Sequence, residues 1–156
     1  MKNRIYIITG LSKSGKTTSL MSWTSSQKNI DGILQPVIEE KRFFYHISSR
    51  TLFQLESEDD VNSIKVGRYK FRLEAFNWAN EKLINCIGKN LEWIVVDEIG
   101  FLELNGEGLH SSVKKLLSST LNEKLIFVVR ESLLQQVLDY YQIDNYETMK
   151  LQYNSF

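Results

Sequence analysis

Hydrophobic positions along the chain recur with two periods, which separate predicted strands from predicted helices. Residues 4–9 are apolar on both alternating faces and rich in β-branched side chains, as in a strand buried within a parallel sheet. Further buried strands are predicted at 93–97 and 125–129. Apolar residues at helical spacing predict helices over 17–27, 73–87, 109–121 and 132–141. Strands that alternate with helices predict an α/β fold, a largely parallel three-layer sheet with right-handed crossovers.

Residues 32–72 depart from this alternation. Short extended runs separated by polar breaks fill most of the segment, at 33–38, 43–47, 51–55 and 64–72. They predict an antiparallel β meander inserted after the first strand and helix, which we expect to lie beside the main sheet. Because the chain has no internal repeat or low-complexity tract and only one proline, we expect a single domain over residues 1–156.

The turn between the first strand and the first helix carries a phosphate-binding motif. Residues 10–17 read Gly-Leu-Ser-Lys-Ser-Gly-Lys-Thr and match G-x-x-x-x-G-K-[ST] at every fixed position. Glycines allow backbone N–H groups to surround a triphosphate, and the helix N-terminus adds a partial positive charge. The predicted nucleotide-binding residues are Gly10, Leu11, Ser12, Lys13, Ser14, Gly15, Lys16, Thr17 and Thr18. The strand before the motif and the helix after it supply the context that such a loop requires.

A second motif ends the apolar strand at 93–97. Adjacent strand residues point in different directions, so Asp97 and Glu98 are predicted to have separate tasks. We expect Asp97 to hold Mg²⁺ together with the Thr17 hydroxyl, and Glu98 to orient or deprotonate the attacking water. Lys16 would bind the β and γ phosphates, and Gly100, in a D-x-x-G pattern, could donate its N–H to the γ phosphate. Two exposed carboxylates at a strand end are the alternative to these roles.

Phosphoryl transfer also benefits from a cation that neutralises charge on the γ oxygens. Arg130 follows the strand at 125–129, at the sheet edge where ligands bind open α/β folds, and is the internal candidate. A solvated arginine at a strand end is the alternative. No N-K-x-D stretch, which would recognise guanine, follows the motif at the end of the strand at 93–97, so the sequence does not specify which nucleobase is preferred.

Composition narrows the possible partners and cofactors. Nineteen Lys plus Arg balance nineteen Asp plus Glu, so no overall field attracts nucleic acid or anionic lipid. Cys86 is the only cysteine, which excludes an internal disulfide, and with two histidines it predicts no zinc cluster. No apolar run approaches a membrane span, so we expect a cytoplasmic protein whose ligands are a nucleoside triphosphate and Mg²⁺. No protein partner can be named from the sequence.

Four segments together resemble the small P-loop nucleoside-triphosphatase family known from thermophilic prokaryotes, which has a cancer-related animal relative. They are the phosphate loop, Gly-Ile-Leu-Gln-Pro-Val-Ile at 32–38, Val-Gly-Arg-Tyr at 66–69 and Asp-Glu-Ile-Gly-Phe-Leu-Glu-Leu at 97–104. The resemblance implies a RecA-like fold and Mg²⁺-dependent hydrolysis of ATP, GTP and other nucleoside triphosphates. Phe101 stands where that family usually has a lysine, and Val128-Val129-Arg130 replaces its small-residue pattern.

Two other functions are compatible with the same motifs. A nucleotide or small-molecule kinase uses the same phosphate machinery with an acceptor in place of water, although no arginine-rich lid follows the third α/β unit. A nucleotide-dependent binding module or switch would use the aromatic segment at 32–56 to hold a partner.

Overall fold

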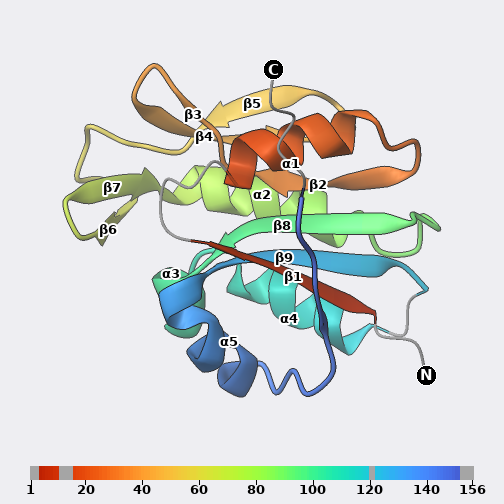
Figure 1. Cartoon of the computed structure of the whole chain (residues 1–156). Helices are drawn as coiled ribbons and strands as arrows, with labels where there is room; N and C mark the ends of the chain where they lie inside the picture. The colour runs from red at the N-terminus through yellow and green to blue at the C-terminus, as the bar shows by residue number, and fades with distance from the viewer. Residues whose placement is uncertain (1–3, 11–15, 120–121, 152–156) are drawn as a thin grey trace.

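The computed structural model describes residues 4–10, 16–119 and 122–151. Its framework is a mixed sheet in the order β10-β1-β9-β8-β2-β4-β3, with β5 paired to β4 (Figure 1). The parallel part comprises β10 (Glu147–Thr148), β1 (Ile5–Gly10), β9 (Lys124–Arg130), β8 (Trp93–Ile99) and β2 (Ile30–Leu34). This arrangement confirms the predicted α/β fold with a mostly parallel sheet.

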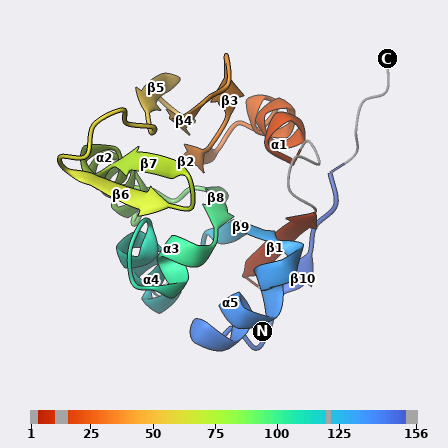
Figure 2. The same cartoon turned by 90° about the vertical axis from the view of Figure 1, so that its left-hand side faces the viewer.

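Helices cover both faces of this sheet (Figures 1 and 2). Leu20 of α1 packs on one face, and the other face is covered by α2, α4 and α5. The helices are α1 (Lys16–Ser25), α2 (Leu73–Ile84), α3 (Phe101–Leu104), α4 (His110–Ser118) and α5 (Leu134–Tyr140), the last preceded by the 3₁₀ turn η1 (Glu131–Leu133). No helix in the described part of the chain is both long and apolar enough to cross a membrane.

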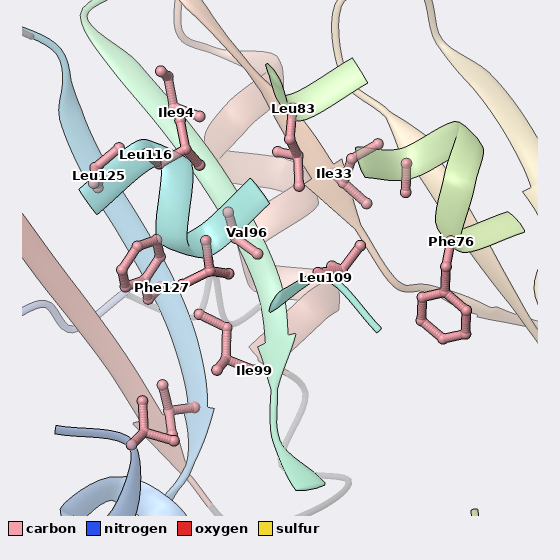
Figure 3. Close-up of a cluster of buried hydrophobic side chains, with 14 of the residues drawn as sticks. Ile33, Phe76, Leu83, Ile94, Val96, Ile99, Leu109, Leu116, Leu125 and Phe127 are labelled. Atoms are coloured by element: carbon pink, nitrogen blue, oxygen red, sulfur yellow. The ribbon is translucent and has the colours of Figure 1, made fainter. Parts of the chain in front are cut away.

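The core is split between the two faces because strand side chains alternate. Ile94 and Val96 of β8 pack with Phe127 of β9 under α2 and α4, as Figure 3 shows. Trp93 and Val95, the intervening residues of β8, instead belong to the cluster under α1. Because β8 and β9 lie between neighbours and have helices on both faces, their apolar runs are almost continuous.

The segment at 32–72 continues the main sheet. The predicted run at 33–38 is split into β2, which pairs with β8, and the short β3 (Val37–Ile38). Gly32 permits the close approach of β2 to β8, since a Cβ at this position would overlap the backbone of Val95. After β2, β4 (Lys41–His46) and β5 (Thr51–Gln54) extend the same sheet in antiparallel fashion. Our expectation of an arm beside the sheet is therefore wrong for this part of the segment.

The run at 64–72 is a hairpin and not one extended piece. It consists of β6 (Ser63–Val66) and β7 (Tyr69–Arg72), joined at Gly67, whose φ is 59°. The hairpin forms its own two-stranded sheet. In Figure 2, which views the carboxyl ends of the parallel strands, the hairpin and α3 lie in front of the main sheet.

Candidate nucleotide-binding site

The carboxyl ends of the parallel strands bring the predicted site residues to one edge of the sheet. Strand β1 ends at Gly10, the first residue of the phosphate loop, and Gly10 lies in register with Arg130 at the end of β9. Strand β8 supplies Asp97 and Glu98 at the same edge. Ligands of open α/β sheets bind at such edges, so the chain topology alone places these groups around one region.

Thr17 and Asp97 meet directly. The Thr17 hydroxyl, in the first turn of α1, donates a hydrogen bond of 2.9 Å to Oδ2 of Asp97, which is fully buried at the end of β8. Gln35, which follows β2, donates its backbone N–H to the same oxygen at 2.9 Å and its side-chain Nε2 to the Asp97 carbonyl at 3.1 Å. Three segments far apart in the sequence thus converge on one carboxylate.

The donor set of this pair suits a hard divalent cation. Hydroxyl and carboxylate oxygens are preferred by Mg²⁺, which usually keeps several waters and is shared with substrate phosphates. In the described part of the chain, no group of three or more His, Cys, Asp or Glu side chains could hold a metal on its own. A metal here would therefore be bound by Thr17, Asp97 and a phosphate ligand together, and the two residues fit that task.

Glu98 adopts a backbone conformation that is rare for residues other than glycine. Its φ is 62°, and the pairing of β8 with β9 shifts register between Val96 and Ile99. Such left-handed conformations are costly and cluster at functional sites. As a result, Glu98 is half-buried and lines a cavity, whereas Asp97 is directed to Thr17. The two adjacent carboxylates point in different directions, as their order in the strand predicts.

Arg130 lines the same cavity as Glu98. It is half-buried at the end of β9, and its guanidinium forms no ion pair with any residue that the structure describes. The pairing of its backbone with Gly10 places it beside the start of the phosphate loop. This position is compatible with the predicted contact to the transferred phosphoryl group.

The phosphate loop itself is described only at its two ends. The predicted contacts of Leu11, Ser12, Lys13, Ser14 and Gly15 lie outside the described residues. The backbone of Lys16 opens α1, but its side chain also lies outside the description. Thr18 follows in the first turn of α1 and is exposed.

The Gly100 N–H, which the sequence predicts to contact the γ phosphate, has a partner within the protein. Its N–H donates a 2.8 Å hydrogen bond to Oε1 of Glu103, so this N–H is already engaged within the loop after β8. Glu103 also accepts a 2.9 Å bond from the N–H of Leu109 through Oε2. Gly100 therefore contributes a backbone anchor for α3, and its contact with a phosphate stays a prediction.

Glu103 is a buried acid beside the candidate site that the sequence analysis did not identify. Only 4% of the residue is exposed, and desolvation raises the pKa of its carboxyl group to about 7 even though the Leu109 and Gly100 N–H groups lower it. Glu103 ties the end of β8 to the start of α4 and thereby fixes the wall of the cavity that contains Glu98. The signal available in the sequence was an acidic residue within an otherwise apolar helical turn.

The cavity beside Glu98 has a volume of about 310 Å³. Its walls come from the ends of β8 and β9, from Gln35, from α3 and from the β4 and β6–β7 strands. Gln35, which binds Asp97 and also borders the cavity, was likewise missed from the sequence. Its signal was its position directly after a sheet strand and before Pro36.

Comparisons with known proteins identify the family and the fold of the chain. The model of a protein family described as NTPase matches residues 5–154. The chain belongs to this NTPase family. Membership confirms the resemblance drawn from the sequence and implies that nucleoside triphosphates are its ligands and that hydrolysis is its general activity. A comparison with curated protein sequences finds no significant match.

Two solved structures share the fold of this NTPase-family chain. The crystal structure of THEP1 from the hyperthermophile Aquifex aeolicus has 17% sequence identity and a TM-score of 0.73, over 95% of this chain and 90% of THEP1. The solution structure of a human cancer-related nucleoside triphosphatase has 20% identity and a TM-score of 0.69, over 97% of this chain and 90% of that protein. At these sequence identities, the structural similarity establishes the fold of the chain.

Proposed function

We propose that this NTPase-family chain is a Mg²⁺-dependent nucleoside-triphosphatase that converts ATP, GTP and related triphosphates to diphosphate and phosphate. The observation that carries the proposal is the 2.9 Å hydrogen bond between Thr17 Oγ1 and Asp97 Oδ2, which joins the start of the phosphate-loop helix to the strand-end carboxylate. A threonine and an aspartate in these two positions are the protein groups that hold the metal in P-loop enzymes.

Each residue has a separate part in binding. The backbone of the loop that starts at Gly10 would surround the polyphosphate, and Lys16 would add a positive charge near the β and γ phosphates. Thr17 and Asp97 would hold Mg²⁺, which, when bound, neutralises charge on the phosphate oxygens. Gln35 fixes Asp97 by donating both to its carboxylate and to its carbonyl.

Hydrolysis needs a water that is held in line with the bond to be broken. Glu98 would accept a proton from this water, whose oxygen forms a bond to the γ phosphorus. The bond between the γ phosphorus and the oxygen that bridges to the β phosphate breaks, and the diphosphate leaves with that oxygen. Arg130 would offset the negative charge that accumulates on the γ oxygens.

Phosphate release from ATP and GTP tests this proposal with matched variants. Lys16→Ala and Glu98→Gln are each expected to lower kcat by about two orders of magnitude or more, since one removes a phosphate contact and the other removes the base. Glu107→Gln is the control for Glu98→Gln, because Glu107 is an exposed carboxylate in the loop between α3 and α4. Full activity in Glu98→Gln would remove Glu98 from the mechanism, and a wild-type protein that binds Mg-ATP without hydrolysing it would remove the enzyme function.

A further inference from the structure

We propose that the cavity beside Glu98 is a second substrate site, which binds a small ring-bearing anion with a free hydroxyl group and presents that hydroxyl as an acceptor for the γ phosphoryl group. This inference rests on the proposed function, because it uses the same nucleotide site and the same Glu98. It adds a phosphotransferase reaction to the hydrolysis, in which water is the acceptor when the cavity is empty.

The position of the cavity suits an acceptor. Glu98 and Arg130 are on its wall, at the sheet edge where the phosphate loop begins. Its remaining described walls include Gln35 and Arg42, so the cavity extends from β8 past β2 toward β4. In the sheet order, β4 lies on the opposite side of β8 from β1, which leads into the phosphate loop. A nucleotide on the loop and a second molecule in the cavity would therefore approach Glu98 from opposite sides.

The charges on the cavity wall favour an anion. Arg42, Arg68 and Arg130 all border the cavity, and none of their guanidinium groups forms an ion pair with a described residue. Arg42 and Arg68 surround the ring of Tyr69, with their Cζ atoms 5.9 and 5.1 Å from its centroid, and Arg68 donates a 3.0 Å hydrogen bond to the Tyr69 hydroxyl. Unpaired guanidinium groups gathered in this way are suited to carboxylate or phosphate recognition.

The two carboxyl groups on the cavity wall differ in the hydrogen bonds that they accept. Of the two carboxyl groups on the wall, Glu103 already accepts two backbone hydrogen bonds, whereas Glu98 accepts none from any residue that the structure describes. An anionic group placed next to Glu98 would be repelled. We therefore orient the ligand with its anionic group at Arg42 and Arg68 and its neutral hydroxyl at Glu98.

Aromatic side chains form the apolar part of the cavity. Tyr69 and Phe71 are stacked with centroids 6.0 Å apart and an interplanar angle of 8°, and Phe76 and Phe101 also border the space. Phe101 is 54% exposed although it is a large apolar residue. A volume of about 310 Å³ is at the lower end of ligand cavities, which argues for one ring with one anionic group.

The transfer step balances without a further reactant. Glu98 accepts the proton of the acceptor hydroxyl, and the hydroxyl oxygen forms the new bond to the γ phosphorus. The bond to the oxygen that bridges to the β phosphate breaks, and the nucleoside diphosphate departs with that oxygen. The products are the phosphorylated acceptor, the diphosphate and a proton, which Glu98 returns to solvent.

Binding to the cavity can be tested separately from catalysis. Saturation-transfer NMR is carried out on protein saturated with Mg-ADP, so that the nucleotide site is filled, with ribose 5-phosphate and 4-hydroxybenzoate as individual probes, each of which has one ring, one anionic group and a free hydroxyl. We expect saturable binding of at least one probe, weakened about ten-fold or more in Arg68→Gln and in Arg42→Gln through loss of a charged hydrogen bond. Lys65→Gln is the charge-matched control, because Lys65 lies on the same hairpin, outside the cavity, and is exposed.

Three results would overturn the inference. The first is that no probe binds. The second is that wild type and both arginine variants bind the probe with equal affinity. The third is that Lys65→Gln loses as much affinity as the arginine variants. The phosphate and carboxylate probes distinguish which anion the arginines select.

A second measurement tests the acceptor role. For a probe that binds, diphosphate formation from Mg-ATP should exceed free phosphate release, and the difference should equal the phosphorylated probe found by mass spectrometry. Equal amounts of diphosphate and free phosphate would show that the cavity does not hold an acceptor. Hydrolysis of ATP without any probe is measured in parallel, so that failure of the proposed hydrolysis is distinguished from failure of the second site.

Discussion

Gly10 and Arg130 lie directly opposite each other where the parallel strands β1 and β9 end. The pairing fixes the start of the phosphate loop beside an arginine that has no ion-pair partner among the described residues. Because both residues belong to central strands of the sheet, their separation is determined by backbone hydrogen bonds and not by a loop. A cation held in this way is preorganised for the charge that develops during phosphoryl transfer.

Replacement of Arg130 should therefore affect the chemical step more than binding. We expect Arg130→Ala to lower kcat by about 10²-fold or more while KM changes by about threefold or less, since arginine fingers contribute about 10³ to 10⁵ in rate. Steady-state phosphate release measures both constants. The control is Arg50→Gln, because Arg50 is exposed in the turn after β4, which runs antiparallel to β2 and ends at the other edge of the sheet. An Arg130→Ala variant that changes only KM would contradict the assignment.

Glu98 should show opposite effects on stability and activity. Its φ of 62° costs a residue with a Cβ about 1–2 kcal/mol, which glycine avoids at an entropic cost of about 0.5–1 kcal/mol. We expect Glu98→Gly to unfold with a free energy about 0.5–1 kcal/mol higher than wild type, or equal to it, while its hydrolytic activity is lost. Urea denaturation and phosphate release measure the two effects. Clear destabilisation of Glu98→Gly would mean that the Glu98 side chain supports the fold.

Glu103 should make stability depend on pH. Its pKa is raised from 4.5 to about 7 by burial, so the folded state binds a proton that the unfolded state releases near pH 4.5. The free energy of unfolding should fall as pH rises from about 4.5 to about 7, by up to about 3 kcal/mol, and this contribution should be constant outside that window.

The contribution of Glu103 to the pH dependence of stability can be isolated by comparing wild type with a variant that cannot ionise at this position. Denaturant unfolding of wild type and Glu103→Gln is compared across the same pH window. We expect Glu103→Gln to be about as stable as wild type at low pH, where the neutral acid and the amide each offer one strong acceptor oxygen to the two backbone N–H groups, and to lose less stability as the pH rises. Parallel pH profiles of the two proteins would contradict the raised pKa of Glu103.

The parts of the fold that could be predicted from the sequence are those with strong local patterns. Strands β1, β8 and β9 have nearly continuous apolar runs because they are buried on both faces. The phosphate loop and the Asp97–Glu98 pair could be located for a related reason, because each lies directly at the end of such a strand. Their convergence on one edge then follows from parallel topology.

Features that depend on one residue or on distant contacts could not be predicted in this way. The run at 64–72 gives no local indication of a reversal except Gly67, whose positive φ makes the hairpin turn. Strand β2 approaches β8 closely only because Gly32 has no side chain. The cavity and the contacts of Gln35 and Glu103 result from tertiary packing, so neighbouring residues in the sequence do not indicate them.

The central claim, that Thr17 and Asp97 hold a metal on a bound triphosphate, is tested most directly by titration calorimetry of ATP with and without Mg²⁺. We predict that Mg²⁺ strengthens ATP binding to wild type by about ten-fold or more, equivalent to about 1.4 kcal/mol. Thr17→Ser, which keeps the hydroxyl, should retain this gain, and Thr17→Val, which is similar in shape but has no hydroxyl, should lose it. An equal effect of Mg²⁺ on wild type and Thr17→Val, in variants that unfold at the same denaturant concentration, would contradict the claim.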